Sequence, residues 1–107
     1  MLFRIFRVSG DSMLPTLADG DFVLAKKLNE NYLDGNVVII NDTAHGFIIK
    51  RIKELNKKEF AAYGDNKDSN SDQCFGLYTP EDLKFIVKWK VGSVSYTHLT
   101  LPTTTIV

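Results

Sequence analysis

The sequence predicts a mainly β domain, built either as a sandwich or as one coiled sheet. Short apolar segments recur about every 10–13 residues, which is the spacing of strands in such folds and not of βαβ units. Clusters of Gly, Asp, Asn and Pro separate these segments and indicate turns. A length of 107 residues with 44% hydrophobic and 24% charged residues is typical of one globular domain.

Four strands are expected in the first half of the chain. Residues 10–16 break the apolar pattern and predict a turn, and Asp19-Gly20-Asp21 and Asp34-Gly35-Asn36 predict two more. Residues 41–46 combine Asn, Asp, Thr and Gly, which favours a hairpin loop. The strands between these turns are expected over residues 2–8, 22–25, 37–40 and 47–52.

The second half predicts two further strands. A charged turn over 53–58 leads into a short strand that ends at Tyr63, and residues 64–71 form a polar loop. Thr79 followed by Pro80 and two acids favours a single helical turn, with Thr79 as its N-cap. An alternating segment over 85–91 predicts the last strand, so the domain is expected to span residues 1–91.

Residues 92–107 have a different composition. They contain five threonines and few charges, and they do not continue the strand pattern. The string SYTHLTLPTTTIV is similar to translated sequencing-adapter sequence. We therefore expect an irregular tail that need not belong to the natural domain.

Composition excludes several classes of function. Thirteen basic and thirteen acidic residues give no net charge, which argues against nucleic-acid binding by this chain alone. Cys74 is the only cysteine, so no internal disulfide can form. The longest aliphatic run is residues 37–40, far short of the roughly 20 residues of a membrane span. Arg4 and Arg7 interrupt the apolar start, so no signal peptide is expected.

The first candidate for chemistry is Ser12, in a glycine- and proline-containing turn that could hold its hydroxyl exposed. The alternative is an ordinary turn with a capping serine. A serine nucleophile needs a base, and neither His45 nor His98 fits a serine–histidine arrangement. A lysine can serve only if burial lowers its pKa. Lys50 lies among strand residues, but alternation leaves open whether it or Arg51 is the exposed charge.

The polar loop over residues 64–72 offers a second candidate site. Asp68, Asn70 and Asp72 alternate as in a weak calcium loop, but the glycine and terminal glutamate of an EF-hand are missing. We therefore expect no metal and no cofactor.

Four segments together resemble the serine–lysine peptidase superfamily of type I signal peptidases and LexA-like repressors. GDSMLPTL at 10–17 is similar to the nucleophile box G-x-S-M-x-P-T-L, and GDFVL at 20–24 to the strand that follows it. IKRI at 49–52 is similar to the box that carries the general-base lysine. GDN at 64–66, with residues 69–72 and Phe75-Gly76, resembles the late G-D-N…S-x-D-S-R…G box.

The resemblance implies a mainly β fold with coiled antiparallel sheets of the LexA/signal-peptidase catalytic core type. It implies Ser12 as nucleophile and Lys50 as general base, with the amide of Ser12 in the oxyanion hole. Gly10, Met13 and Pro15 would position the substrate and the oxyanion. The late box would orient the lysine through the following residues, of which Ser69 and Ser71 compete for the serine position: Asp65, Asn66, Ser69, Ser71 and Asp72.

The implied function is a serine endopeptidase that cleaves a peptide or leader segment after small residues, without a cofactor. Its partner would be a peptide or protein substrate bound as an added β-strand. The alternative is a LexA-like repressor domain or an inactive dimerisation module that forms a homodimer. A simple β binding module is a third reading. Without an anchor or signal in this chain, the expected location is cytoplasmic or membrane-peripheral.

Overall fold

The computed structural model describes residues 3–27, 35–68, 73–92 and 103–106. Their secondary structure is mainly β, as predicted, with one short 3-10 helix. The elements, in chain order, are β1 (Phe3–Val8), β2 (Phe22–Lys27), β3 (Val37–Asp42), β4 (Gly46–Asn56), β5 (Glu59–Tyr63), β6 (Cys74–Tyr78), η1 (Pro80–Asp82), β7 (Leu83–Gly92) and β8 (Thr103–Ile106).

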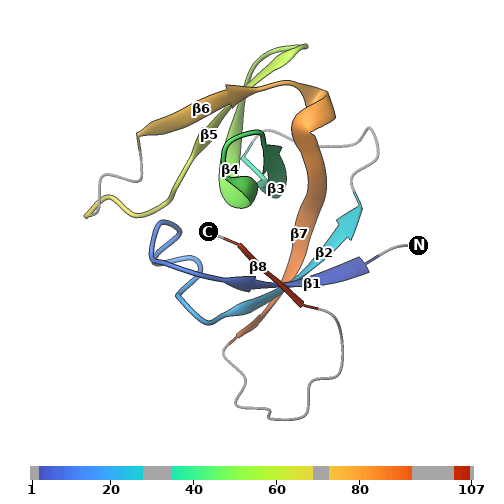
Figure 1. Cartoon of the computed structure of the whole chain (residues 1–107). Helices are drawn as coiled ribbons and strands as arrows, with labels where there is room; N and C mark the ends of the chain where they lie inside the picture. The colour runs from blue at the N-terminus through green and yellow to red at the C-terminus, as the bar shows by residue number, and fades with distance from the viewer. Residues whose placement is uncertain (1–2, 28–34, 69–72, 93–102, 107) are drawn as a thin grey trace.

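These strands form one sheet in the order β6-β5-β4-β3-β7-β2-β1-β8. Neighbouring strands are antiparallel except β1 and β8, which run parallel. The long strand β7 joins the two halves, because it pairs with both β2 and β3, and its register shifts in both pairings. Such irregularities bend a strand, and the sheet curls so that β1 and β2 lie across from β3 and β4 (Figure 1).

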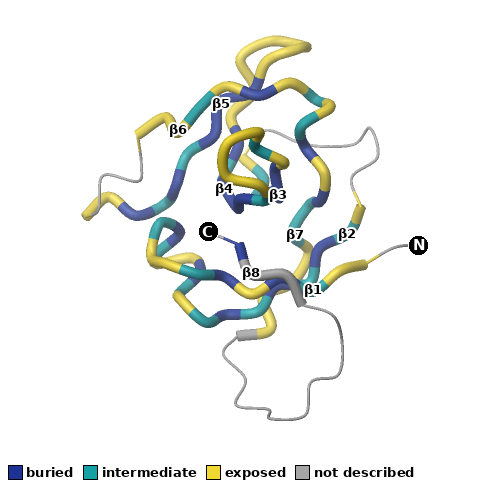
Figure 2. The backbone as a smooth tube through the Cα atoms, viewed as in Figure 1, coloured by how far each residue is buried: buried dark blue, intermediate teal, exposed yellow. Residues whose placement is uncertain are grey.

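Two apolar clusters form the core, and Figure 2 shows the buried positions along the strands. The first joins the β1–β2 half to β3 and β4 and includes Phe6, Met13 and Ile49. The second lies under the β4–β5–β6 half and includes Ile48, Ile52 and Phe60. Strand β4 therefore buries both of its faces over residues 48–50, where a half-exposed strand would bury one.

The predicted strands are confirmed, but several of their ends need correction. The expected turn over 53–58 is too long, because β4 continues to Asn56 and the chain turns at residues 57–58. This end of β4 is exposed on both faces, so its residues carry no apolar alternation to reveal a strand. Strand β6 was missed, since Phe75 and Leu77 on it are exposed. The helical turn after Thr79 is confirmed as η1.

The expectation of an irregular tail over 92–107 is wrong for residues 103–106. These residues form β8 and pair with β1 from Ile5↔Thr103 to Val8↔Ile106. A short run of threonines gives no hydrophobic alternation, so only the tertiary partner reveals this strand. Strand β7 runs from Leu83 to Gly92, so it is longer at both ends than the strand predicted over 85–91.

Candidate active site

Ser12 lies in the connection between β1 and β2, residues 9–21, here called the serine turn. Gly10 has φ +86°, a conformation that favours glycine, and its N–H donates to Asp19 Oδ1 at 2.8 Å. Met13 and Leu17 are part of the first apolar cluster, so their side chains fix the turn to the core. The Leu17 N–H donates to the Met13 carbonyl at 2.9 Å. The turn is thus held at both ends, while Ser12 between these anchors stays half-buried.

Lys50 reaches this turn from β4. Its Nζ lies 3.1 Å from Ser12 Oγ, which is hydrogen-bond distance, although 38 residues separate the two in sequence. Only 5% of Lys50 is exposed. In contrast, the neighbouring Arg51 forms an ion pair with Asp65 and is half-buried. Of the two neighbouring basic residues on β4, it is therefore Lys50 and not Arg51 that contacts Ser12.

The surroundings of Lys50 disfavour its charged form. Burial lowers the pKa of the Lys50 amine below its ordinary value of 10.5. Within the described ranges, no carboxylate forms an ion pair with Nζ that would favour the ammonium. The ring of Phe75 lies over Nζ, 4.8 Å from its centroid, and covers one side of the amine. A cation–π contact favours the ammonium, but burial is the cause that sets the direction of this pKa.

Asn66 fastens the chain after β5 to the serine turn. Its Nδ2 donates to the Asp11 carbonyl at 2.8 Å, and its backbone N–H donates to the Ser12 carbonyl at 3.0 Å. Its Oδ1 accepts the Asp68 N–H at 3.0 Å. Asn66 as a whole is 7% exposed. Asn66 therefore holds two successive peptide groups: the one that carries the Ser12 N–H and the one that begins with the Ser12 carbonyl.

Asp65 joins three segments around the same turn. It accepts from Arg51 Nε at 2.8 Å and Nη2 at 2.7 Å, and from Thr16 Oγ1 at 2.5 Å. The Arg51 hydrogen bond is the main cause that lowers the pKa of Asp65. Arg51 Nη1 also donates to the Gly35 carbonyl at 2.7 Å. Strand β4 is thus tied to the serine turn through the Arg51–Asp65 ion pair, next to Lys50 in sequence.

The structure brings together most of the predicted site residues, with roles that differ in part. Asp65 and Asn66 contact the serine turn, whereas the resemblance implied that their box orients the lysine. Met13 is buried, while Pro15 is exposed and follows a cis peptide bond. Ser69, Ser71 and Asp72 lie outside the described residues. The contact of Phe75 with Lys50 was not anticipated, because an exposed aromatic on an edge strand gives no sequence signal.

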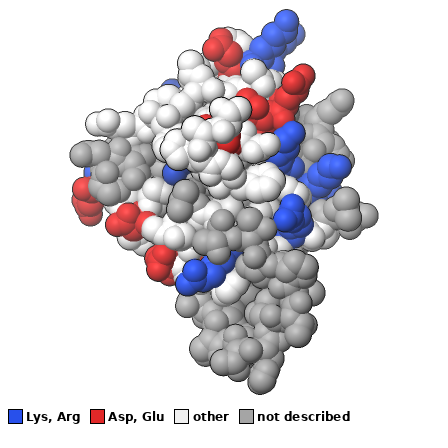
Figure 3. All heavy atoms as spheres, in the orientation of Figure 1, with Lys and Arg blue, Asp and Glu red and all other residues white. Residues whose placement is uncertain are grey.

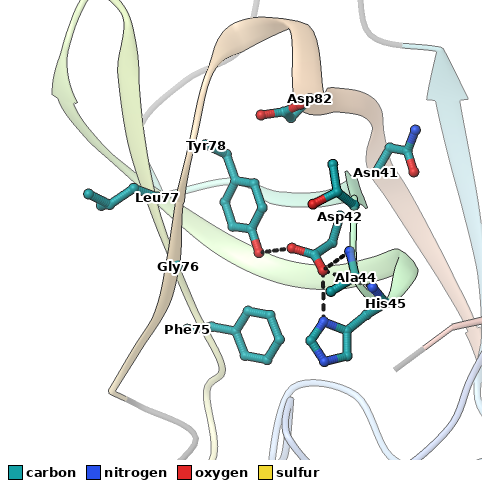
Figure 4. A pocket seen from close by; sticks show the side chains of 10 residues that line it. Asn41, Asp42, Ala44, His45, Phe75, Gly76, Leu77, Tyr78 and Asp82 are labelled. Carbon is teal, nitrogen blue, oxygen red and sulfur yellow. Dashed lines mark hydrogen bonds and ion pairs between the residues drawn. The ribbon is translucent and has the colours of Figure 1, made fainter.

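A second polar group lies at the β3–β4 hairpin. Asp42 accepts from Tyr78 Oη at 2.8 Å and lies 2.7 Å from His45 Nδ1, and both rings point towards it (Figure 4). These bonds lower the pKa of Asp42 from 3.8 to about 2, with the His45 bond as the largest cause. The three residues line a pocket of about 430 Å³ that also contains Phe75. His45 itself is exposed, in agreement with its expected place in a loop.

The described surface carries charges of both signs on the face seen in Figure 3. Among the described residues, the structure contains no helix with the length and apolar character needed to cross a membrane.

Comparison with protein families identifies this architecture. The Peptidase S24-like family matches residues 3–86, which include both Ser12 and Lys50. The chain belongs to this family, within the LexA/signal-peptidase superfamily. Searches of curated proteins and of solved structures gave no match.

Proposed function

We propose that this chain is a serine endopeptidase in which Ser12 is the nucleophile and Lys50 the general base. The observation that carries the proposal is the 3.1 Å separation between Ser12 Oγ and the buried Lys50 Nζ. A serine hydroxyl is a weak nucleophile unless a base accepts its proton. Burial favours the neutral amine, and only the neutral amine has the lone pair that can accept this proton.

The reaction follows from these two groups. As Ser12 Oγ bonds to the carbonyl carbon of the peptide, its proton passes to Lys50 Nζ. When the C–N bond breaks, the Lys50 ammonium returns this proton to the leaving amine, and the acyl group stays on Ser12. Water then attacks the ester, with Lys50 accepting its proton, and the serine hydroxyl is restored when the carboxyl product leaves. Lys50 is neutral at the start and at the end.

Two features support stabilisation of the tetrahedral intermediate. Among the residues described, no acceptor is found for the backbone N–H of Ser12, so this group remains available to an oxyanion. The carbonyls of Asp11 and Ser12 are bound by Asn66, which restrains the peptide planes around this N–H. Asn66 and Asp65 act here as positioning residues, since neither contacts the dyad side chains in the described structure.

The proposal includes an extended peptide as substrate, cleaved after a small residue as the family resemblance implies. The test is hydrolysis of an alanine-containing leader peptide, followed by mass spectrometry of the fragments. Ser12→Ala and Lys50→Met should each abolish cleavage, because the two residues act as a unit. Lys53→Met is the matched control, since Lys53 lies on the same strand and is exposed; it should retain the full rate.

Two results would contradict the proposal. Cleavage that persists in Ser12→Ala would exclude Ser12 as nucleophile. A concentration-dependent dimer without turnover of any peptide would favour the inactive dimerisation module. For that module, the exposed Phe75 and Leu77 on the edge strand β6 offer a contact surface.

A further inference from the structure

Strand β8 occupies the free edge of the strand that leads to Ser12. The sheet order ends in β1-β8, so β8 covers the edge that β1 would otherwise expose. Its chain direction is parallel to β1, and Val8 at the end of β1 is aligned with Ile106. The Ser9 N–H donates to the Ile106 carbonyl at 2.6 Å. Ser9 is three residues before Ser12, so the edge leads directly towards the nucleophile.

The one described side chain of β8 is buried beside the serine turn. Ile106 is 1% exposed and belongs to the same apolar cluster as Val8, Met13 and Leu17. Met13 follows Ser12 in sequence, so Ile106 shares its apolar cluster with the serine turn. Strand β8 also approaches β4, the strand of Lys50. The segment thus lies beside β1, which leads to Ser12, and close to β4, which carries Lys50.

We propose that residues 103–106 are an internal competitor that occupies the peptide-binding edge of β1. An extended peptide gains affinity from main-chain hydrogen bonds to a strand edge and specificity from side-chain pockets. Residues 103–106 use both: they pair with the edge of β1, and Ile106 packs into the first apolar cluster. Only one strand can occupy this edge, so binding of a substrate peptide requires β8 to leave.

Two further observations favour an occupant that can be displaced. The family match ends at residue 86, so β8 lies beyond the matched domain. In addition, β8 has four residues, stands at the edge of the sheet and pairs with β1 alone. Tethering gives such a segment a high effective concentration, typically millimolar for a short link, so it competes even when its intrinsic affinity is weak.

The proposal rests on the proposed peptidase function for its effect on activity, but occupancy of the edge can be tested without catalysis. In the Ser12→Ala chain, the Ser9 amide should exchange slowly with solvent deuterium. Ile106→Asp should speed this exchange, because an isolated carboxylate is not tolerated in the first apolar cluster. Adding the peptide acetyl-TTTIV-amide should then restore protection, whereas acetyl-TTTDV-amide should not.

In the active chain, Ile106→Asp should raise kcat/KM for the leader peptide on the order of 10- to 100-fold, as burial of one isoleucine implies. Ile106→Ala should give a smaller rise, which covers the case in which the aspartate variant fails to fold. Val91→Asp, at an exposed aliphatic position on β7, is the control and should change neither readout. Unchanged Ser9 exchange in both Ile106 variants would overturn the proposal. Altered exchange without activity in any variant would support the occupancy and refute only the peptidase.

Discussion

Replacing Asn66 by alanine should slow catalysis more than it destabilises the fold. The substitution removes the Nδ2 donor of the Asp11 carbonyl and the Oδ1 acceptor of the Asp68 N–H. Asp11 and Asp68 are exposed, so each lost hydrogen bond costs only its net contribution of about 0.5–1.5 kcal/mol. The backbone bond from residue 66 to the Ser12 carbonyl can remain. We therefore expect the free energy of unfolding to fall by about 1–3 kcal/mol, with the native fold retained.

The effect on rate follows from the position of Asp11 beside Ser12. Freed from Asn66, the Asp11–Ser12 peptide plane can rotate, and this moves the Ser12 N–H and the Oγ relative to Lys50. Misplacement of a reacting group by about 1 Å can cost on the order of 100-fold in rate. We expect kcat for peptide cleavage to fall by about 10- to 100-fold. KM should change little, because Asn66 does not line the β1 edge where we place the peptide.

Asn56 provides a matched control for this experiment. Its Oδ1 accepts the Lys58 N–H at 2.8 Å, in the same i+2 arrangement that Asn66 makes with Asp68, and its Nδ2 donates to Glu59 at 3.1 Å. Asn56 is exposed at the β4–β5 turn. Urea denaturation should show a loss of about 1 kcal/mol or less for Asn56→Ala, with kcat unchanged. An Asn66→Ala chain that cleaves peptide at the wild-type rate would refute the positioning argument.

Two further predictions concern pH. Because burial lowers the pKa of Lys50 in the folded chain, the unfolded chain binds more protons between the folded and the unfolded pKa. The stability should therefore rise with pH across that window, up to about 10.5, and Lys50→Met should remove this rise in urea midpoints measured from pH 6 to 11. The cleavage rate should rise with pH through the same folded pKa; a rate that falls there would contradict a neutral base. For Asp42, the pKa is lowered to about 2, so its stabilisation is present above about 3.8 and is lost as pH falls towards 2. Asp42→Asn should flatten the acid side of the stability curve between pH 4 and 2, and an unchanged slope would argue against the His45 and Tyr78 bonds.

Local sequence was sufficient for much of the fold. Alternating apolar residues and turn-forming clusters placed most strands, because inward-facing positions and tight turns restrict residue type. The strand segments that the sequence did not predict are the outer end of β4, strand β6 and strand β8. Their residues are mostly exposed or, in β8, mostly of one type. Their strand conformation comes from pairing with a neighbour, which leaves no periodic pattern.

The sequence by itself also determined the candidate chemistry: a serine in a glycine–proline turn, a lysine within an apolar strand, and no histidine in a suitable place. It could not decide between Lys50 and Arg51, because both faces of β4 are buried at this point and alternation then has no meaning. Only the curl of the sheet decides it, by bringing the turn after β1 to the Lys50 side of β4 and Asp65 to Arg51. The same curl decides the place of Asn66 and of β8, because contacts between residues far apart in sequence depend on the path of the whole chain.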